Sequence, residues 1–336
     1  MKQFPLFLLL LLFTYAHSSQ AQKSAIATRI AEEKASGYAD GFNTNIALSD
    51  QSLNFLVIGD WGRHGGYHQK AVAGQMAKVA ATADVNFIIS VGDNFYPDGV
   101  QSAQDPSWNS SFENIYSNHM LFSDWWVVLG NHDYKGNIQA QIDYSKISRR
   151  WNMPATYFSR KIKLENGKEL LLVFLDTNPF VTSYYEKSGN MRENLALQDT
   201  AAQYKWLKET LADTATNIHW KIVVGHHPMY SGGMRKGKKD TEEIRLKFES
   251  LFNAHKVDAY ICGHEHDLQI IKPAQQFTTQ FLSGAACEVR PSGATEGTEF
   301  WAADPGMMLF SLSPKELKIQ VIHADGRILH RKKISR

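Results

Sequence analysis

Side chains that bind metal ions or transfer protons occur in five short motifs, each led by a glycine. The motifs are GDWG (59–62), GDNFY (92–96), GNHDY (130–134), GHHP (225–228) and GHEH (263–266). They supply carboxylate, amide, phenol and imidazole groups but no thiol. Such donors suit iron, zinc or manganese, whereas the lack of sulfur disfavours copper(I) and iron–sulfur clusters. Together, the motifs predict a metal site.

Each motif alone also has an ordinary structural explanation. A Gly-Asp pair after a strand is a common turn, in which the aspartate bonds its own backbone. Residues 131–133 can be a plain polar loop, and His264 and His266 can share one face of a strand for packing reasons. The shared placement of all five motifs, however, is improbable for independent turns.

Continuous apolar runs predict strands that are covered on both faces. They are LNFLVI (53–58), VNFIIS (85–90), WWVVL (125–129), LLLVFL (170–175), HWKIVVG (219–225), VDAYIC (257–262) and FTTQFLSGAAC (277–287). Apolar spacing predicts a helix over 68–83. A second helix is expected over 240–252, where Asp240 at the start and Glu243 three positions later resemble a capping box. Because strands and helices alternate and the second half is rich in strands, we expect an α/β domain with two packed sheets.

The motifs follow predicted strands, and the carboxyl ends of strands converge on the ligand crevice of open α/β sheets. Seven side chains can therefore meet in space: Asp60, Asp93, Tyr96, Asn131, His226, His264 and His266. Seven ligands exceed the need of one tetrahedral ion. Two ions that share a carboxylate fit better, and a pair about 3.5–4 Å apart can clamp the attacking and leaving oxygens of a displacement reaction.

The ordered motifs, with DWG first and GDNFY second, resemble the purple acid phosphatases of the calcineurin-like metallophosphoesterase superfamily. The small, mammalian-type, tartrate-resistant branch is the more similar one. The resemblance runs from about Leu53 to the C-terminus and includes AYICGHEHDLQ and FLSGA. It implies a four-layer α/β fold, in which two packed mixed sheets are flanked by helices.

The resemblance also implies the ligand set of a dinuclear centre. Asp60, Tyr96 and His266 would hold Fe(III); Asn131, His226 and His264 would hold Fe(II) or Zn(II), with manganese as an alternative; Asp93 would bridge the ions. Many relatives carry Asp-x-His in the first motif, where this chain has Gly62. Tyr96 would fill that vacancy as a phenolate, and ferric phenolate charge transfer gives the family its colour.

The implied reaction is the in-line attack of a metal-held hydroxide on a phosphate monoester. His132, next to Asn131, is the candidate to bond the phosphoryl oxygen or protonate the leaving group, with a supporting turn histidine as the alternative. Asp133 is expected to support a ligand or loop.

The chain departs from the mammalian-type pattern in three places. His227 replaces a tyrosine and can line the pocket. Met234 and Arg235 stand where a Glu-His pair is usual, so Arg235 or Lys236 becomes a candidate substrate contact, with a solvated loop as the alternative. The loop 177–190 lacks a cysteine that the family often carries, and it is a candidate cover for the site with Tyr184 and Tyr185 exposed.

The first 21 residues predict a signal peptide that ends after Ser19-Gln20-Ala21, because Lys2 precedes an apolar core too short to span a bilayer. We expect a lead-in of low order over 22–52, with a short helix near TRIAEEKA, and a catalytic domain over 53–336. The product would be exported, to the periplasm or the exterior, without a membrane anchor. Cys262 and Cys287 either form a disulfide or remain buried free thiols.

The composition is that of an ordinary globular protein and does not favour a nucleic-acid partner. Hydrophobic residues make up 43% and charged residues 21%, which is ordinary for a globular protein. A formal charge of +2, or about +1 without the leader, does not indicate binding to nucleic acid. The expected partners are small phosphate esters and phosphoproteins, and the expected state is a monomer.

Three functions compete. The first is an exported acid phosphatase, the second a phosphodiesterase or nucleotide hydrolase with two divalent ions, and the third a non-catalytic metal-binding protein. Tyr96 and Gly62 argue against the second, and the complete ligand set with His132 argues against the third.

Overall fold

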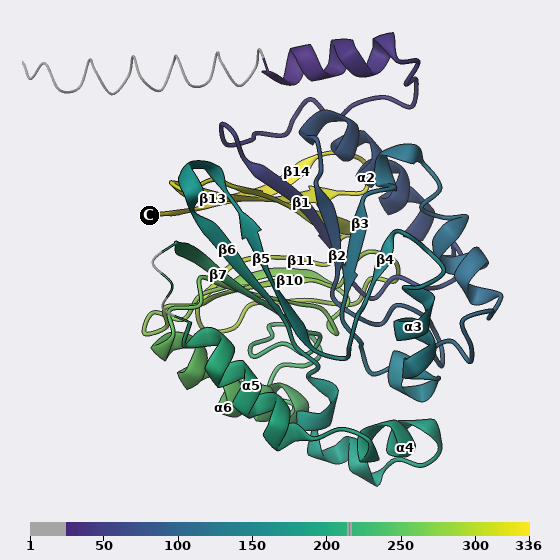
Figure 1. Cartoon of the computed structure of the whole chain (residues 1–336), viewed down its shortest axis with the longest axis vertical. Helices are drawn as coiled ribbons and strands as arrows, with labels where there is room; N and C mark the ends of the chain where they lie inside the picture. The colour runs from purple at the N-terminus through teal and green to yellow at the C-terminus, as the bar shows by residue number, and fades with distance from the viewer. Residues whose placement is uncertain (1–24, 214, 216) are drawn as a thin grey trace, which may run out of the picture.

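The computed structural model describes residues 25–336 except 214 and 216. Two seven-stranded sheets pack face to face, and helices cover both outer surfaces (Figure 1). This four-layer α/β arrangement confirms the predicted fold class.

The first sheet joins the beginning and the end of the described chain. Its strands, in spatial order, are β14 (Ile328–Ser335), β13 (Glu316–His323), β12 (Gly306–Leu312), β1 (Leu53–Ile58), β2 (Phe87–Ser90), β3 (Asp124–Val127) and β4 (Trp151–Asn152). The strands β1 to β4 run parallel, while β12 pairs antiparallel with β1. The sheet is therefore mixed, with its parallel half formed by the strands that precede three of the motifs.

The second sheet is also mixed. Its order is β11 (Thr298–Ala302), β9 (Leu268–Ile271), β10 (Thr279–Ser283), β8 (Ala259–Cys262), β7 (Ile218–Val224), β6 (Glu169–Phe174) and β5 (Phe158–Lys163). The central strands β10, β8, β7 and β6 are parallel. The remaining two motifs follow β7 and β8, so both sheets send motif loops to the same edge.

Three apolar layers hold the sheets and helices together. The layer between the sheets contains Phe55, Phe281 and Phe310, all fully buried. A second layer lies between the first sheet and α2 (Gln69–Ala83), and a third lies between the second sheet and the helices α5 (Thr200–Leu211) and α6 (Lys239–Ala254). Figure 1 shows α5 and α6 side by side on the far side of the second sheet.

Shorter helices fill the connections between the strands. They are η1 (Trp108–Glu113), η2 (His119–Leu121), η3 (Asp133–Lys135), α3 (Ile138–Tyr144), η4 (Glu165–Gly167), η5 (Asn178–Phe180), η6 (Thr182–Glu186) and α4 (Asn190–Ala196). The stretch 177–190, predicted as a covering loop, thus contains the short helices η5 and η6 and ends where α4 begins.

The apolar runs form the expected strands, and the helices predicted over 68–83 and 240–252 are α2 and α6. The capping box, however, is wrong. Helix α6 begins at Lys239, and its N-cap residue Lys238 makes no side-chain capping bond. Asp240 instead lies inside the first turn, where one carboxylate oxygen bonds Arg235 and His264 and the other accepts from Thr241 N.

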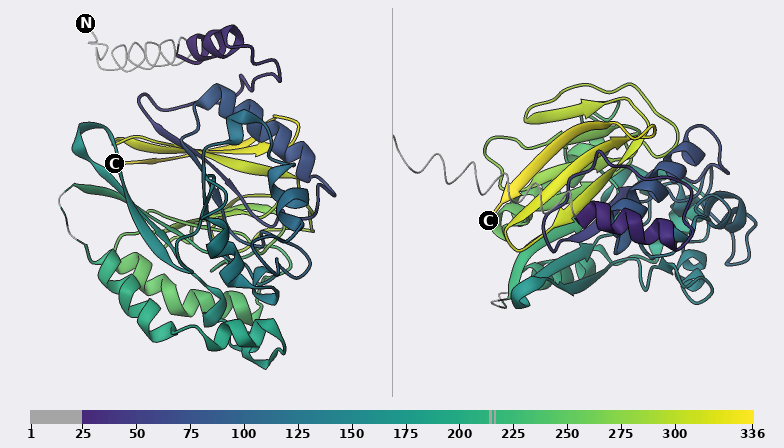
Figure 2. Two further views of the ribbon diagram at one scale, coloured as in Figure 1. Left: turned by 45° about the vertical axis from the view of Figure 1, so that its right-hand side comes forward. Right: turned by 90° about the horizontal axis from the view of Figure 1, so that it is seen from above.

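The segment 25–52 contains the short helix that was expected near TRIAEEKA, and part of the rest is hydrogen-bonded to the first sheet. Residues 25–35 are helical and lie outside the two sheets (Figure 2). Further on, the backbone of Ala47 exchanges two hydrogen bonds with the Gln320 amide, and Ser49 N donates to Ser311 Oγ at 2.8 Å. These bonds attach the segment to β12 and β13. The predicted signal peptide, 1–21, lies outside the described residues.

Cys262 and Cys287 are both buried free thiols, so the disulfide alternative is wrong. Each thiol belongs to a different apolar layer, Cys262 beside α6 and Cys287 beside α2. Within the described part of the chain, no helix has the length and apolar character needed to cross a membrane.

Trp61, from the first motif, anchors an aromatic cluster behind the site. Its ring is fully buried, and its centroid lies 5.4 Å from that of the Tyr116 ring and 5.7 Å from that of the Phe95 ring. Its indole N–H donates to Ser90 Oγ at 2.8 Å. The first motif is thereby fixed to the end of β2.

We predict that Trp61→Ala lowers the free energy of unfolding by about 3–5 kcal/mol, because it opens a cavity in this aromatic cluster. Trp61→Phe keeps most of the volume and loses the hydrogen bond, so it should cost about 1–2 kcal/mol. Urea unfolding followed by circular dichroism measures both. Equal losses in the two variants would contradict the packing role.

Candidate metal centre

The seven predicted ligands do converge at one edge of the two sheets. The first sheet contributes Asp60 after β1, Asp93 and Tyr96 after β2, and Asn131 after β3. The second sheet contributes His226 after β7 and the pair His264 and His266 after β8. All are buried except Asn131, which is half-buried. Residues up to 206 positions apart therefore form one polar cluster inside the molecule.

Tyr96 is the centre of one half of the cluster. Its phenol oxygen lies 2.8 Å from Asp93 Oδ2, 3.2 Å from Asp60 Oδ1 and 3.0 Å from His266 Nε2. Four donor atoms of three chemical kinds thus surround one point. This half has the composition that the sequence predicted for the ferric site.

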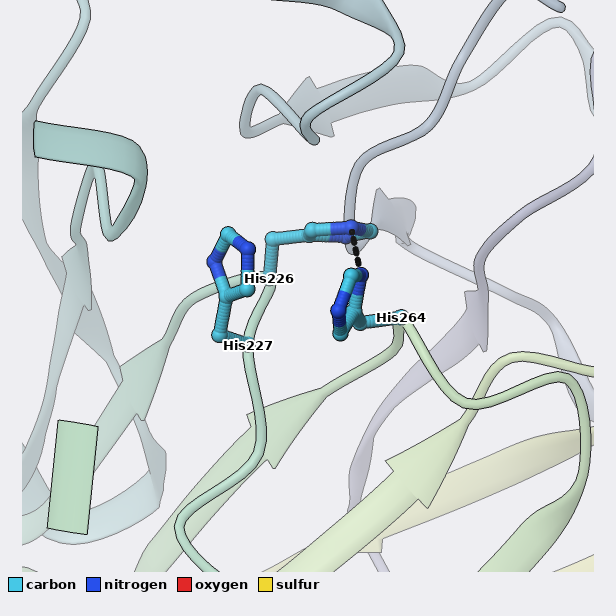
Figure 3. A group of neighbouring side chains, drawn as sticks. All are labelled: His226, His227 and His264. Atoms are coloured by element: carbon cyan, nitrogen blue, oxygen red, sulfur yellow. Dashed lines mark hydrogen bonds between the residues drawn. The ribbon is translucent and has the colours of Figure 1, made fainter. Parts of the chain in front are cut away.

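His226 is the centre of the other half. Its Nε2 lies 3.3 Å from Asn131 Oδ1 and 3.2 Å from His264 Nδ1, as the dashed line in Figure 3 shows for the two rings. Asp93 Oδ1 lies 3.5 Å from the same nitrogen. Since its other oxygen faces Tyr96, the Asp93 carboxylate is shared between the halves.

The electrostatics of the cluster favour a bound cation. Burial and the neighbouring Asp93 raise the pKa of Asp60 well above its usual range. Burial and both aspartates likewise raise the pKa of Tyr96. Two buried carboxylates and a phenol within hydrogen-bond distance repel one another once ionised, and metal ions reverse that effect. The donor set therefore fits the implied metal pair.

The imidazoles carry the lone pairs that metal ions require. Burial lowers the pKa of His226 to about 4 and that of His266 to about 3. Both rings are consequently neutral near pH 7, the form in which histidine binds metals. His226 Nδ1 bonds the Val91 carbonyl at 2.8 Å, which leaves Nε2 as the free ligand atom.

The backbone is strained at three of the ligands. Asp60, Asp93 and His264 have positive φ angles of 59°, 51° and 69°. Such left-handed conformations in non-glycine residues cost on the order of 1–3 kcal/mol each and cluster at functional sites. The surrounding hydrogen bonds, among them His264 N to Asp60 Oδ2 at 3.0 Å, hold them in place.

Gly62 occupies the first-motif position at which many relatives carry a histidine. A Cβ atom on Gly62 would lie 1.7 Å from the Asn94 carbonyl oxygen, so no side chain fits there. The Gly62 carbonyl accepts a hydrogen bond from Tyr96 N at 2.8 Å. The close approach of the first and second motifs thus excludes an imidazole and positions the phenol.

Comparisons with known proteins agree with this geometry. The family model for the calcineurin-like phosphoesterase matches residues 53–268. Purple acid phosphatase 7 of Arabidopsis thaliana is 36% identical over 86% of this chain and 88% of its own. Tartrate-resistant acid phosphatase type 5 of Sus scrofa is 33% identical over 84% of this chain and 87% of its own.

The chain belongs to the purple acid phosphatases of the calcineurin-like phosphoesterase family. Two solved structures share the fold at lower identity. The purple acid phosphatase PPD1 of yellow lupin has a TM-score of 0.64 at 16% identity, covering 85% of this chain and 54% of its own. GAP50, the anchor in the inner membrane complex of Plasmodium, has a TM-score of 0.73 at 22% identity, and the match covers 85% of this chain and 89% of its own. As a family member, the protein is a metallophosphoesterase hydrolase.

In this purple acid phosphatase, His132 stands at the open side of the cluster. Its ring is half-buried and lies 4.3 Å from the Tyr96 ring, while its backbone N donates to Asp93 Oδ1 at 2.8 Å. The ring Nδ1 lies 2.5 Å from the Pro97 carbonyl. In the described part of the chain, no residue hydrogen-bonds Nε2, so this atom is available to a ligand.

His227, which was expected to line the pocket, packs beside the predicted ligands His226 and His264. The ring is fully buried beside His264 (Figure 3), with Nδ1 at 2.8 Å from Thr177 Oγ1 and Nε2 at 2.8 Å from the Tyr184 hydroxyl. Tyr184 is accordingly half-buried, whereas it was predicted to be exposed. The imidazole takes this position because two hydroxyls satisfy both ring nitrogens.

Arg235 lies near the cluster and is partly exposed. Its guanidinium contacts Asp240 Oδ2 at 3.0 Å, and that oxygen lies 3.1 Å from His264 Nε2. Burial alone would raise the pKa of Asp240, but His264 and Arg235 bring it down to about 2. Lys236, the other candidate contact, donates to the Ala294 carbonyl at 2.9 Å.

Sequence reasoning missed two polar neighbours of the half of the cluster around Tyr96. The Arg63 guanidinium lies 3.9 Å from the centroid of the Tyr96 ring and contacts Glu288 Oε2 at 2.6 Å. The same oxygen lies 3.5 Å from His266 Nδ1. Arg63 directly follows the first motif, so its position was a usable signal, whereas Glu288 belongs to no motif.

Asp133 organises the loops that carry Asp93 and Asn131, as expected from its supporting role. Its carboxylate accepts hydrogen bonds from the backbone N of Gly130 at 2.8 Å, Asn94 at 3.1 Å and Phe95 at 3.2 Å. It thereby ties the second motif to the third.

We predict that Asp133→Ala destabilises the protein by about 3 kcal/mol or more, because three buried N–H groups lose their acceptor. It should also weaken metal binding, since both loops lose their common anchor. Urea unfolding and metal analysis after gel filtration measure the two effects. Asp143→Ala, on the exposed part of α3, is the control; matching losses there would contradict the anchoring role.

Proposed function

We propose that the protein is an exported acid phosphatase that hydrolyses phosphate monoesters at a ferric–divalent metal centre. The observation that supports this best is the Tyr96 phenol, which lies within 3.2 Å of two carboxylate oxygens and an imidazole nitrogen. An anionic phenolate favours a trivalent ion, and family membership supplies the reaction class. The relatives named acid phosphatases give the substrate class.

The two halves of the cluster divide between the two ions. Asp60, Tyr96 and His266 would hold Fe(III), and Asn131, His226 and His264 would hold Fe(II), Zn(II) or Mn(II), while Asp93 would serve both. The anionic ligands lie on the ferric half together with the shared carboxylate. The other half supplies only neutral groups of its own, which suits an ion of lower charge.

When bound, the metal ions would acidify a water molecule and attract the phosphate dianion. The surrounding residues would then orient the ester and handle its proton. His132 would place Nε2 toward the leaving oxygen, because the Pro97 carbonyl holds Nδ1. In its protonated imidazolium form, His132 would pass the Nε2 proton to the leaving alkoxide as the ester bond breaks and would keep the Nδ1 proton. Arg235, in the loop beside His264, is the proposed cationic contact for a substrate phosphate.

Export, a monomeric state and phosphoprotein substrates also belong to the proposal. The apolar leader 1–21 supports export, and the basic side chains of the exposed Lys236 and the half-buried Arg235 would suit anionic substrates. The near-neutral formal charge supports small esters rather than nucleic acid as the partner.

The proposal predicts a pink to purple protein whose colour depends on Tyr96. In Tyr96→Phe, the charge-transfer band should disappear while iron remains bound, since Asp60, Asp93 and His266 are kept. A visible spectrum beside metal analysis of both proteins measures this. A fully metallated but colourless wild type under oxidising conditions would overturn the ferric assignment and favour a pair of divalent ions.

We further predict that His132→Ala lowers kcat on a phosphate monoester about 10²- to 10⁴-fold without loss of metal or colour. Steady-state kinetics with 4-nitrophenyl phosphate, beside metal analysis, measures the effect. His119→Ala, in the short helix η2, is the control for removal of a histidine elsewhere. Unchanged turnover in His132→Ala would exclude the proton-transfer role.

A further inference from the structure

The carboxylate of Asp240 reaches a proposed metal ligand from outside the five motifs. Its Oδ2 lies 3.1 Å from Nε2 of His264, and both side chains are buried. Asp240 belongs to the first turn of α6, whereas His264 follows β8. The contact therefore joins a covering helix to the metal centre.

The hydrogen bond decides which ring nitrogen of His264 faces the metal. A carboxylate only accepts hydrogen bonds, so Nε2 carries the proton and Nδ1 keeps its lone pair. Nδ1 lies 3.2 Å from His226 Nε2, on the side of the cluster that Figure 3 shows. Without the acceptor, the other tautomer would place a proton where the divalent ion is expected.

Arg235 competes with His264 for the same oxygen. Its Nη1 lies 3.0 Å from Asp240 Oδ2, and the Asp240 Oδ1 atom accepts from Thr241 N at 2.9 Å. The guanidinium therefore neutralises part of the charge that Asp240 would present to His264. A carboxylate that loses this neighbour becomes a stronger acceptor and a stronger counter-charge for a cation.

The loop that carries Arg235 is fixed to the ligand pair itself. Glu265, between His264 and His266, accepts hydrogen bonds from Arg235 N at 2.6 Å and from Ser231 Oγ at 2.7 Å. Glu265 is also buried. Because Glu265 fixes the backbone of Arg235, the guanidinium starts from a position close to Asp240.

We infer that Asp240 is a positioning residue for His264 and that Arg235 weakens its action, so that the pair sets the affinity of the divalent ion. The inference rests on the proposed function, because it assigns His264 to the divalent subsite. It explains why the divalent half, whose own ligands are neutral, has a carboxylate directly behind one of them. Outer carboxylates of this kind typically change metal affinity about 10- to 100-fold.

The test measures how easily the holoprotein loses its divalent ion. The zinc–iron form is dialysed against dipicolinate at graded concentrations, zinc and iron are quantified, and the visible band reports the ferric half. Asp240→Ala should lose zinc at a chelator concentration about 10- to 100-fold lower than the wild type, with its colour intact. Asp240→Asn, which keeps an acceptor oxygen, should restore part of the affinity.

Arg235→Met should change the zinc affinity in the opposite direction. It removes a positive charge and keeps the length of the side chain, so it should hold zinc about two- to fivefold more tightly than the wild type. A purely structural ion pair would make both variants lose zinc, and this outcome would overturn the inference, as would unchanged affinity in Asp240→Ala. Failure of the proposed function shows separately, as a wild type that does not retain two metal ions.

Discussion

The structure depends on the burial of like charges at one edge of two sheets. Asp60 and Asp93 both contact the Tyr96 hydroxyl in a region closed to solvent. An isolated buried carboxylate is costly, so two of them beside a phenol must be neutralised, either by a proton, as the raised pKa of Asp60 indicates, or by cations between them. The left-handed backbone at Asp60, Asp93 and His264 is the local form of the same constraint, since the chain accepts strain to bring these donors together.

Much of the site could be predicted because it follows from the strand pattern. An apolar run identifies a strand, a glycine marks where it ends, and the residues after it lie at the edge that parallel strands share. Asp60, Asp93 and His226 illustrate this order, since each comes within three residues of its strand's end. The alternation of strands and helices also gave the α/β class. What the pattern left open was the assignment of metals, which depends on the chemistry of Tyr96 and its neighbours.

The neighbours behind the ligands could not be predicted, for a physical reason. Asp240 has the sequence context of a helix cap, and only the packing of α6 against the loop after β8 brings it to His264. His227 has the context of a pocket residue, yet two hydroxyls from separate segments enclose it. Such contacts depend on side-chain directions between elements, which local periodicity does not encode. The ordered segment around Ala47 was missed likewise, because its partner Gln320 is 273 positions away.

The pairing of β1 with β12 has a consequence for how the protein reaches its native state. Val57 is paired with Met308, and β12 is in turn paired with β13. The strand β1, which precedes Asp60, therefore lies between β2, from the early part of the domain, and β12, from its last part. The first sheet cannot close until nearly the whole chain has been synthesised. Contacts of such long range make folding slow and leave strand edges open during synthesis. A chain that is released in full before it folds is suited to this topology, since it presents β1 and β12 at the same time.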